Sequence, residues 1–274
     1  MRERLTATVV WCAAGLVLGA FAWLMGDVLW RGLGGVSWAF LSQSPASAGR
    51  AGGIAPILLA TVWIVAIAIA VSLPLGVASA AWLVEFGGRR PARQRRIETA
   101  LDVLAGVPSI VFGLFGNAVF VVALGLGFSI LSGGLTLACM ALPVLVRVIA
   151  IGLQAVPGEL RQGAAACGLT RWTTLTRLLL PAAAPALLAG TLLGIGRALA
   201  ETAALLFTSG YVDRYPGSPL DSGRAMSVHI FDLAMNVPGG EGNAYASALV
   251  LVVLIVAINL ATHAALGSWR RRPS

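Results

Sequence analysis

Three ionisable residues lie inside long apolar stretches of this sequence: Arg147, Arg197 and Glu201. A charged side chain at the centre of a bilayer costs about 2.5–3.5 kcal/mol on insertion scales, so we expect each to face protein or water. Arg197 and Glu201 are four residues apart, a spacing that puts them on one face of a helix and lets them pair. Because a guanidinium matches a tetrahedral oxyanion bidentately, Arg147 and Arg197 could help such an anion across, with Glu201 holding Arg197 in place.

A structural interpretation of the same three residues stays open. Arg197 and Glu201 would then form a staple between helices, and Arg147 would extend its side chain to the nearer membrane surface. The sequence alone does not separate the two interpretations.

Other kinds of reactive site have little support. The cysteines Cys12, Cys139 and Cys167 lack metal-ligand spacing, and His229 and His263 are isolated. An intramembrane enzyme would need paired carboxylates, a metal cluster or an activated serine, and Glu201 is the one buried acid candidate. The chain contains no lysine, so it has no Gly-x₄-Gly-Lys-Ser/Thr phosphate loop. We therefore expect no enzyme activity, no metal and no cofactor in this chain.

The elements that position these residues are membrane spans. The chain has 274 residues, of which 58% are hydrophobic and 11% charged, whereas soluble domains carry about 25% charged residues. A helix needs about 20 apolar residues to cross a bilayer. Six segments qualify: Ala7–Leu29, Ile54–Val84, Ala100–Leu124, Ser129–Leu153, Pro185–Phe207 and Ala244–Leu266. Gly106 and Pro108 predict that the third span is broken or kinked.

Arginine placement predicts the orientation of the spans. The net charge of +8 might suggest nucleic acid, but the arginines lie between apolar runs, as in a membrane protein. Arginine enrichment marks the cytoplasmic side, so we expect both termini there. The cytoplasmic set is Arg2, Arg4, Arg89, Arg90, Arg93, Arg95, Arg96, Arg161, Arg171, Arg177, Arg270, Arg271 and Arg272; the opposite set is Arg31, Arg50, Arg214 and Arg224.

Between the fourth and fifth spans lies an amphipathic segment, residues 157–181, which we call the elbow. Pro157 and Gly158 end the preceding helix, Gly168 suits a left-handed helix end, and Thr170 is a plausible N-cap for the next helix. Trp172, Leu175 and Leu179 then form an apolar stripe at helical spacing. Periodicity does not decide whether this stripe lies on lipid headgroups or in a groove of another protein.

The elbow resembles the cytoplasmic signature loop of ATP-binding-cassette (ABC) importer permeases. The resemblance implies a coupling helix that inserts into an ATPase subunit. The positions assigned to this coupling loop are Gln162, Gly163, Ala164, Gly168, Arg171, Leu180 and Pro181. The signature commonly begins with Glu-Ala-Ala, so Gln162 departs from it and removes any salt bridge that the acid makes in relatives.

Three further stretches resemble phosphate-importer permeases, and the third resembles their PstA-type subunit: 104–116, 196–208 and 227–234. The resemblance covers about residue 50 to the end. It implies an all-α integral membrane protein with about six transmembrane helices and the type I ABC importer permease fold, in the bacterial inner membrane. The division expected is 1–53, a first span and outer loop, and 54–274, the importer transmembrane domain.

The resemblance also implies the partners and the cargo. They are a PstC-like permease, a dimer of ATPase subunits that bind ATP and magnesium, a periplasmic phosphate-binding protein, membrane lipid, and phosphate as cargo, without nucleic acid. A permease for another oxyanion or small solute remains the alternative.

Overall fold

The computed structural model describes residues 2–87 and 91–270, and these residues are almost entirely helical. Arg89, Arg90, Arg271 and Arg272 lie outside the described residues, as do the side chains of Arg2, Arg93, His263 and Arg270. Contacts divide the chain into two compact units, Met1–Ala55 with His229–Val253 and Pro56–Val228 with Leu254–Ser274. The expected division after residue 53 stays a prediction.

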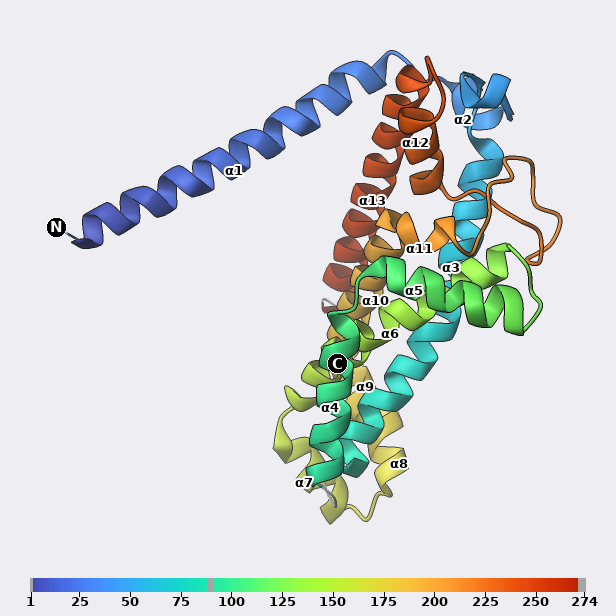
Figure 1. Cartoon of the computed structure of the whole chain (residues 1–274). Helices are drawn as coiled ribbons and strands as arrows, with labels where there is room; N and C mark the ends of the chain where they lie inside the picture. Colours follow the sequence, from blue (N-terminus) through green and yellow to red (C-terminus); the bar gives the residue numbers. More distant parts are fainter. Residues whose placement is uncertain (1, 88–90, 271–274) are drawn as a thin grey trace. The chain divides into compact units, whose positions relative to one another are not determined.

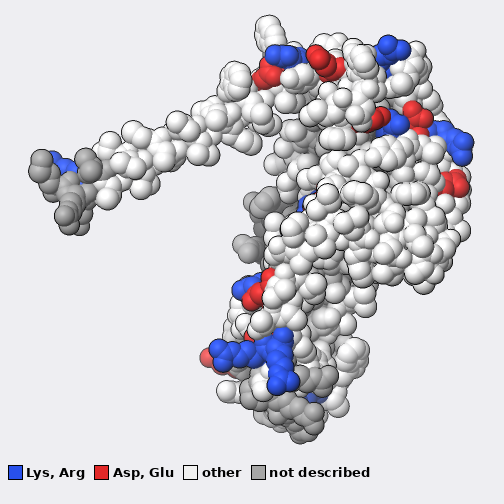
Figure 2. All heavy atoms as spheres, viewed as in Figure 1, with Lys and Arg blue, Asp and Glu red and all other residues white. Residues whose placement is uncertain are grey.

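The first unit begins with helix α1, Arg2–Leu33. Within Thr6–Leu33 an 18-residue apolar window has no buried residue, and Figure 2 shows α1 as almost uniformly uncharged between its ends. After α1 come the short helix α2, Trp38–Ser42, and a hairpin of Pro45–Ala46 (β1) and Ala51–Gly52 (β2). A helix that is apolar on all sides, as α1 is, is typical of a membrane span.

Two contacts connect α1 and the hairpin to α13, Glu241–Arg270, within the first unit. Arg31 pairs with Asp27 at 2.7 Å and lies 5.1 Å from the ring centroid of Tyr245. The side-chain amide of Asn243 donates to the Gly49 carbonyl at 2.7 Å. The two ends of this unit, far apart in sequence, are therefore joined by side chains.

The second unit contains most of the candidate site residues, and its elements follow one another in Figure 1. They are α3 (Ala55–Ala81) with a π segment (Trp82–Phe86), α4 (Pro91–Ala105), α5 (Ser109–Gly116) with a π segment (Asn117–Ala123), α6 (Ile130–Gln154), α7 (Gly158–Ala166), α8 (Arg171–Thr174) with a π segment (Leu175–Leu179), α9 (Leu180–Ala182), α10 (Ala184–Ala200), α11 (Ala203–Leu206) and the start of α12 (Met226–Met235).

The number of spans depends on two bent helix pairs. Four helices are long and apolar enough to cross a membrane, and the described residues give up to six if each bent pair is one span. Gln94–Ala105 and Ser109–Ala123 meet at 98°, which confirms the predicted break in the third span. Pro108 causes this break because it has no N–H to donate and its extended ψ of 142° leaves the helical region.

The fifth span differs from the prediction of one continuous helix over Pro185–Phe207. It follows a 69° bend between Arg171–Ala182 and Ala184–Ala200. Helix α10 then ends at Ala200 because Glu201 has an extended backbone, with φ −75° and ψ 127°, and α11 restarts at Ala203.

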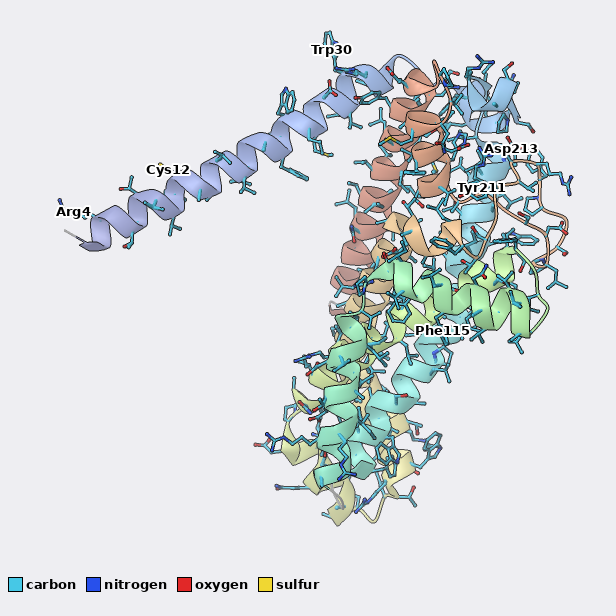
Figure 3. All side chains as sticks on the ribbon, viewed as in Figure 1. Arg4, Cys12, Trp30, Phe115, Tyr211 and Asp213 are labelled. Carbon is cyan, nitrogen blue, oxygen red and sulfur yellow. The ribbon has the colours of Figure 1, made fainter. Side chains whose placement is uncertain are left out.

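Helix α6 forms the centre of the second unit and packs on two apolar clusters. The first cluster joins its N-terminal part to α5, α10 and α11 through residues such as Leu137, Phe112 and Leu205. In Figure 3, α5 with Phe115 runs across the long axis of this unit. Gly113 allows this crossing, because a Cβ there would lie 2.9 Å from the Ala204 Cα.

Candidate functional site

The elbow has the local geometry that its sequence predicts. Helix α7 starts after Pro157 and ends at Ala166, and Gly168 follows it with a φ of +71°, the left-handed value that glycine tolerates. The Leu169 N–H donates to the Ala164 carbonyl at 3.0 Å, as in a glycine-terminated helix end. The Thr170 hydroxyl accepts from the Thr173 N–H at 3.2 Å and caps α8, as predicted.

The predicted coupling residues divide between the surface and the interior of the elbow. Gln162, Gly163, Gly168, Arg171 and Pro181 are exposed. Ala164 is buried, and Leu180 packs against the second apolar cluster. Figure 2 shows arginine side chains gathered at this end of the second unit.

The predicted apolar stripe of the elbow differs in burial along its length. Trp172 is 68% exposed, whereas Leu175 and Leu179 are buried in one cluster with Leu153 of α6 and Leu83 of the segment after α3. Trp172 still lines an apolar cavity together with Leu175 and Leu180. The two leucines therefore fix the elbow to the spans, and Trp172 remains available at the surface.

Arg161 and Glu85 form an ion pair that the sequence pattern does not predict. The two residues are 76 positions apart, and Arg161 Nη2 lies 2.8 Å from Glu85 Oε1. The guanidinium also donates to the carbonyls of Leu153 and Val156, each at 2.8 Å. No local pattern could have revealed this pair, although a basic residue just past a helix end is a known way to satisfy its last carbonyls.

A cavity of about 470 Å³ opens beside this ion pair. Its lining mixes apolar and charged side chains from the segment after α3 and from the elbow: Val84, Glu85, Phe86, Arg161, Ala165, Leu169, Arg171 and Thr174. The elbow thus presents exposed arginine next to a hollow, a surface into which a polar protein segment could fit.

Arg147 is paired with Asp102, a partner that the sequence pattern does not predict. The pair joins α6 to α4, and both side chains are exposed within the isolated chain, at 63% and 54%. Beside it lies a cavity of about 230 Å³ that Glu98 and Ala150 also line. Arg147 therefore has a carboxylate partner within the chain, and an anion that binds this arginine must compete with Asp102.

Arg197 and Glu201 do not form the expected pair. Four-residue spacing brings side chains together only on a continuous helix, and α10 ends between them. The structure gives no ion pair between these two described residues; the Arg197 Nε is buried without a hydrogen-bond partner. The Glu201 backbone carbonyl instead accepts from the Ser227 hydroxyl. The expectation that Glu201 holds Arg197 is wrong, because the helix breaks there.

The loop between α11 and α12 carries further charged residues, among them Asp213, which Figure 3 labels beside Tyr211. Asp221 accepts from the backbone N–H groups of Gly217 at 2.7 Å and Ser218 at 3.1 Å. These hydrogen bonds lower the pKa of the Asp221 carboxyl below its usual value. Among the described residues, no group of three His, Cys, Asp or Glu is placed to hold a metal ion.

Comparison with known proteins gives a consistent family. Residues 72–272 match the family model described as "Binding-protein-dependent transport system inner membrane component". The chain is 30% identical to the probable ABC transporter permease protein YqgI of Bacillus subtilis, over 94% of this chain and 93% of that protein. It is 31% identical to the phosphate transport system permease protein PstA 1 of Mycobacterium tuberculosis, over 95% and 87%.

A solved structure shares the fold at low sequence identity. It is a bacterial ABC transporter involved in the import of the acidic polysaccharide alginate, with a TM-score of 0.66 at 14% identity, covering 100% of both chains. At this identity the similarity shows the fold of the chain and does not identify its cargo.

Proposed function

The chain belongs to the family of binding-protein-dependent transport system inner membrane components, and from that premise we propose that it is a permease subunit of an ATP-driven phosphate importer. It is an all-α, multi-pass inner-membrane protein with the fold of type I ABC importer permeases. The observation that carries the choice of phosphate is the 31% identity to a PstA-named phosphate permease over 95% of this chain.

The cargo path we propose uses Arg147 and Arg197. Both arginines belong to helices of the second unit, α6 and α10, whose sequences are otherwise mostly apolar. The buried, unpartnered Arg197 Nε supports a role for this residue, because an anion oxygen could accept from it. Asp102 supports release, because it offers Arg147 an alternative partner after the anion has left.

The energy source we propose is a partner ATPase that docks on the elbow. The chain has no lysine and so no phosphate loop of its own, which assigns ATP and magnesium to another chain. The exposed Gln162, Gly163 and Arg171 beside the 470 Å³ cavity support docking there. In this arrangement the elbow and both termini are cytoplasmic, following the arginine bias.

The remaining partners in the proposal are a PstC-like sister permease and a periplasmic phosphate-binding protein. The loop between α11 and α12 lies on the opposite side of the spans from the elbow in the proposed topology, where a binding protein would meet it. This chain itself is proposed to have no catalytic activity and no cofactor.

Co-purification followed by ATP hydrolysis tests the proposal. The detergent-solubilised chain should carry with it an ATPase and a second permease, and phosphate-loaded binding protein should stimulate hydrolysis by this complex. Stimulation by a binding protein loaded with a different oxyanion or solute, but not with phosphate, would support the alternative cargo. A chain that purifies alone, from membranes where all partners are expressed, would contradict the assembly.

A further inference from the structure

Arg161 is the point at which three elements of the second unit meet. It belongs to α7, and its Nη2 and Nε atoms lie 2.8 Å and 3.1 Å from one Glu85 oxygen, on the π segment that ends α3. Its Nη1 and Nη2 groups also donate to the carbonyls of Val156 and Leu153, at the end of α6. We call this set of contacts the Arg161 clamp.

The clamp is better shielded from water than the other two ion pairs of the described residues, Arg31–Asp27 and Arg147–Asp102. The Arg161 and Glu85 side chains are 29% and 15% exposed, whereas those of Arg147 and Asp102 are 63% and 54% exposed. Exposed pairs contribute little to stability because water screens them, and removal of one partner from a more buried pair leaves the other charge unsatisfied. The positive charge also interacts favourably with the carbonyl end of α6.

Helix α7 has little else to hold it. Ala164 is its sole buried residue, and a side chain added at Gly158 or Gly163 would meet nothing within 4 Å. The following segment, in contrast, is fixed by Leu175 and Leu179, which are 2% and 0% exposed in the second apolar cluster. Without the clamp, α7 would be held by Ala164 and by its two short chain connections, 155–157 to α6 and 167–170 to α8, and neither connection ties it to the end of α3.

We propose that Arg161 is a positioning residue that makes α7 move as one body with the ends of α3 and α6. A displacement of α7 by a docked ATPase is then passed to both helices, because close-packed elements transmit displacement rather than absorb it. Without the clamp, α7 moves with the ATPase, and the displacement is no longer passed to α3 and α6. This inference rests on the proposed docking of an ATPase at the elbow and does not depend on which anion is carried.

The test uses the whole transporter in proteoliposomes, with its sister permease, ATPase subunits and phosphate-loaded binding protein. Phosphate uptake and ATP hydrolysis are measured on the same preparation for the wild type, Arg161→Gln and Glu85→Gln. We expect phosphate taken up per ATP hydrolysed to fall about tenfold in both variants, with hydrolysis within about twofold of wild type, because each loses charge-assisted hydrogen bonds. Arg177→Gln is the matched control, since Arg177 is an exposed arginine of the same elbow for which the described residues give no ion pair.

Two further measurements separate positioning from a merely structural role. Backbone amide exchange in α7 should be faster in Arg161→Gln and Glu85→Gln than in the wild type, and unchanged in Arg177→Gln. The charge swap Arg161→Glu with Glu85→Arg should recover part of the lost uptake per ATP, because the ion pair can form again.

An unchanged ratio of uptake to hydrolysis in both single variants would overturn the inference. So would a parallel loss of uptake and hydrolysis that matches lower amounts of complex, since that result means the pair only stabilises the fold. A wild-type complex that hydrolyses ATP but transports another anion refutes the phosphate assignment instead, and the ratio is then measured with that anion.

Discussion

Arg197 is the residue on which the proposed anion path depends most. Its Nε is buried and unpartnered, and an unsatisfied buried donor costs roughly 1–3 kcal/mol. The break of α10 after Ala200 keeps Glu201 from neutralising it through the helix. A guanidinium whose Nε has no hydrogen-bond partner within the described residues can donate from that atom to a transient anionic ligand.

Substitution of Arg197 tests that role. We expect Arg197→Ala to lower phosphate uptake at least about tenfold, the effect of about 1.4 kcal/mol. Arg197→Lys should recover the charge but only part of the uptake, because lysine lacks the planar fork. Radiolabelled uptake, normalised to the amount of complex in the membrane, measures both, and wild-type uptake by the alanine variant would exclude Arg197 from the path.

Asp102 gives a second residue-scale prediction. Its carboxylate competes with a transported anion for Arg147, so Asp102→Asn should bind phosphate more tightly and release it more slowly. The expected signature is a lower KM for phosphate-loaded binding protein together with a lower maximal uptake rate. Glu98→Gln is the control, because Glu98 lines the same cavity but its oxygen accepts from Gln94. Equal kinetics for Asp102→Asn and wild type would mean that the pair has no part in transport.

The elbow illustrates which element-scale features a sequence can specify. Gly168 and Thr170 were predicted because helix ends are determined by residues within one turn of each other. The Arg161–Glu85 contact joins positions 76 residues apart, and nothing in the spacing of either residue marks the other. Periodicity places Trp172 and Leu175 beside one cavity, but it does not reveal that Trp172 is exposed while Leu175 is buried against the spans.

The same distinction holds for the spans. The break at Pro108 was predictable because proline removes a backbone donor. The end of α10 at Ala200 has no glycine or proline beside it, so the sequence did not predict where this helix ends. A four-residue spacing brings Arg197 and Glu201 together only on a continuous helix, and α10 ends at Ala200, before Glu201. Spacing along the chain names candidate residues for the site, but it does not give the carboxylate partners of Arg147 and Arg161 or the loss of the expected partner of Arg197.

Gly168 offers an element-scale test of the elbow. Its φ of +71° is unfavourable for alanine, so Gly168→Ala should destabilise the turn by about 1 kcal/mol. Gly158→Ala is the matched control, since Gly158 starts α7 without a positive φ and has free space around it. Amide exchange at α7 and α8 should rise in the first variant and not in the second. Equal exchange in the two would show that the turn geometry is not needed.

The loop between α11 and α12 should respond to acid. The Asp221 pKa is lowered in the folded protein, so its carboxylate stabilises the turn above the unfolded pKa, near 3.8, and this stabilisation is lost as pH falls through the lower folded value. Asp221→Asn should therefore make amide exchange at Gly217 and Ser218 faster at neutral pH. An exchange rate equal to wild type at neutral pH would contradict the proposed hydrogen bonds.

At the scale of the whole molecule, the chain has the features of one part of a larger machine. Helix α1 has an 18-residue apolar window with no buried residue, so lipid or another subunit must cover it. The chain has no phosphate loop, yet it presents a structured elbow with exposed arginine. Family membership accounts for both, because such permeases act within assemblies.

Phosphate accumulation by the reconstituted assembly tests the central claim most directly. Proteoliposomes that contain this chain, its sister permease and the ATPase, with ATP supplied to the ATPase side and binding protein to the other, are given radiolabelled phosphate. The account predicts ATP-dependent phosphate uptake that persists in excess sulfate and disappears when this chain is omitted. ATP-dependent uptake of another solute in its place, with no phosphate uptake, would contradict it.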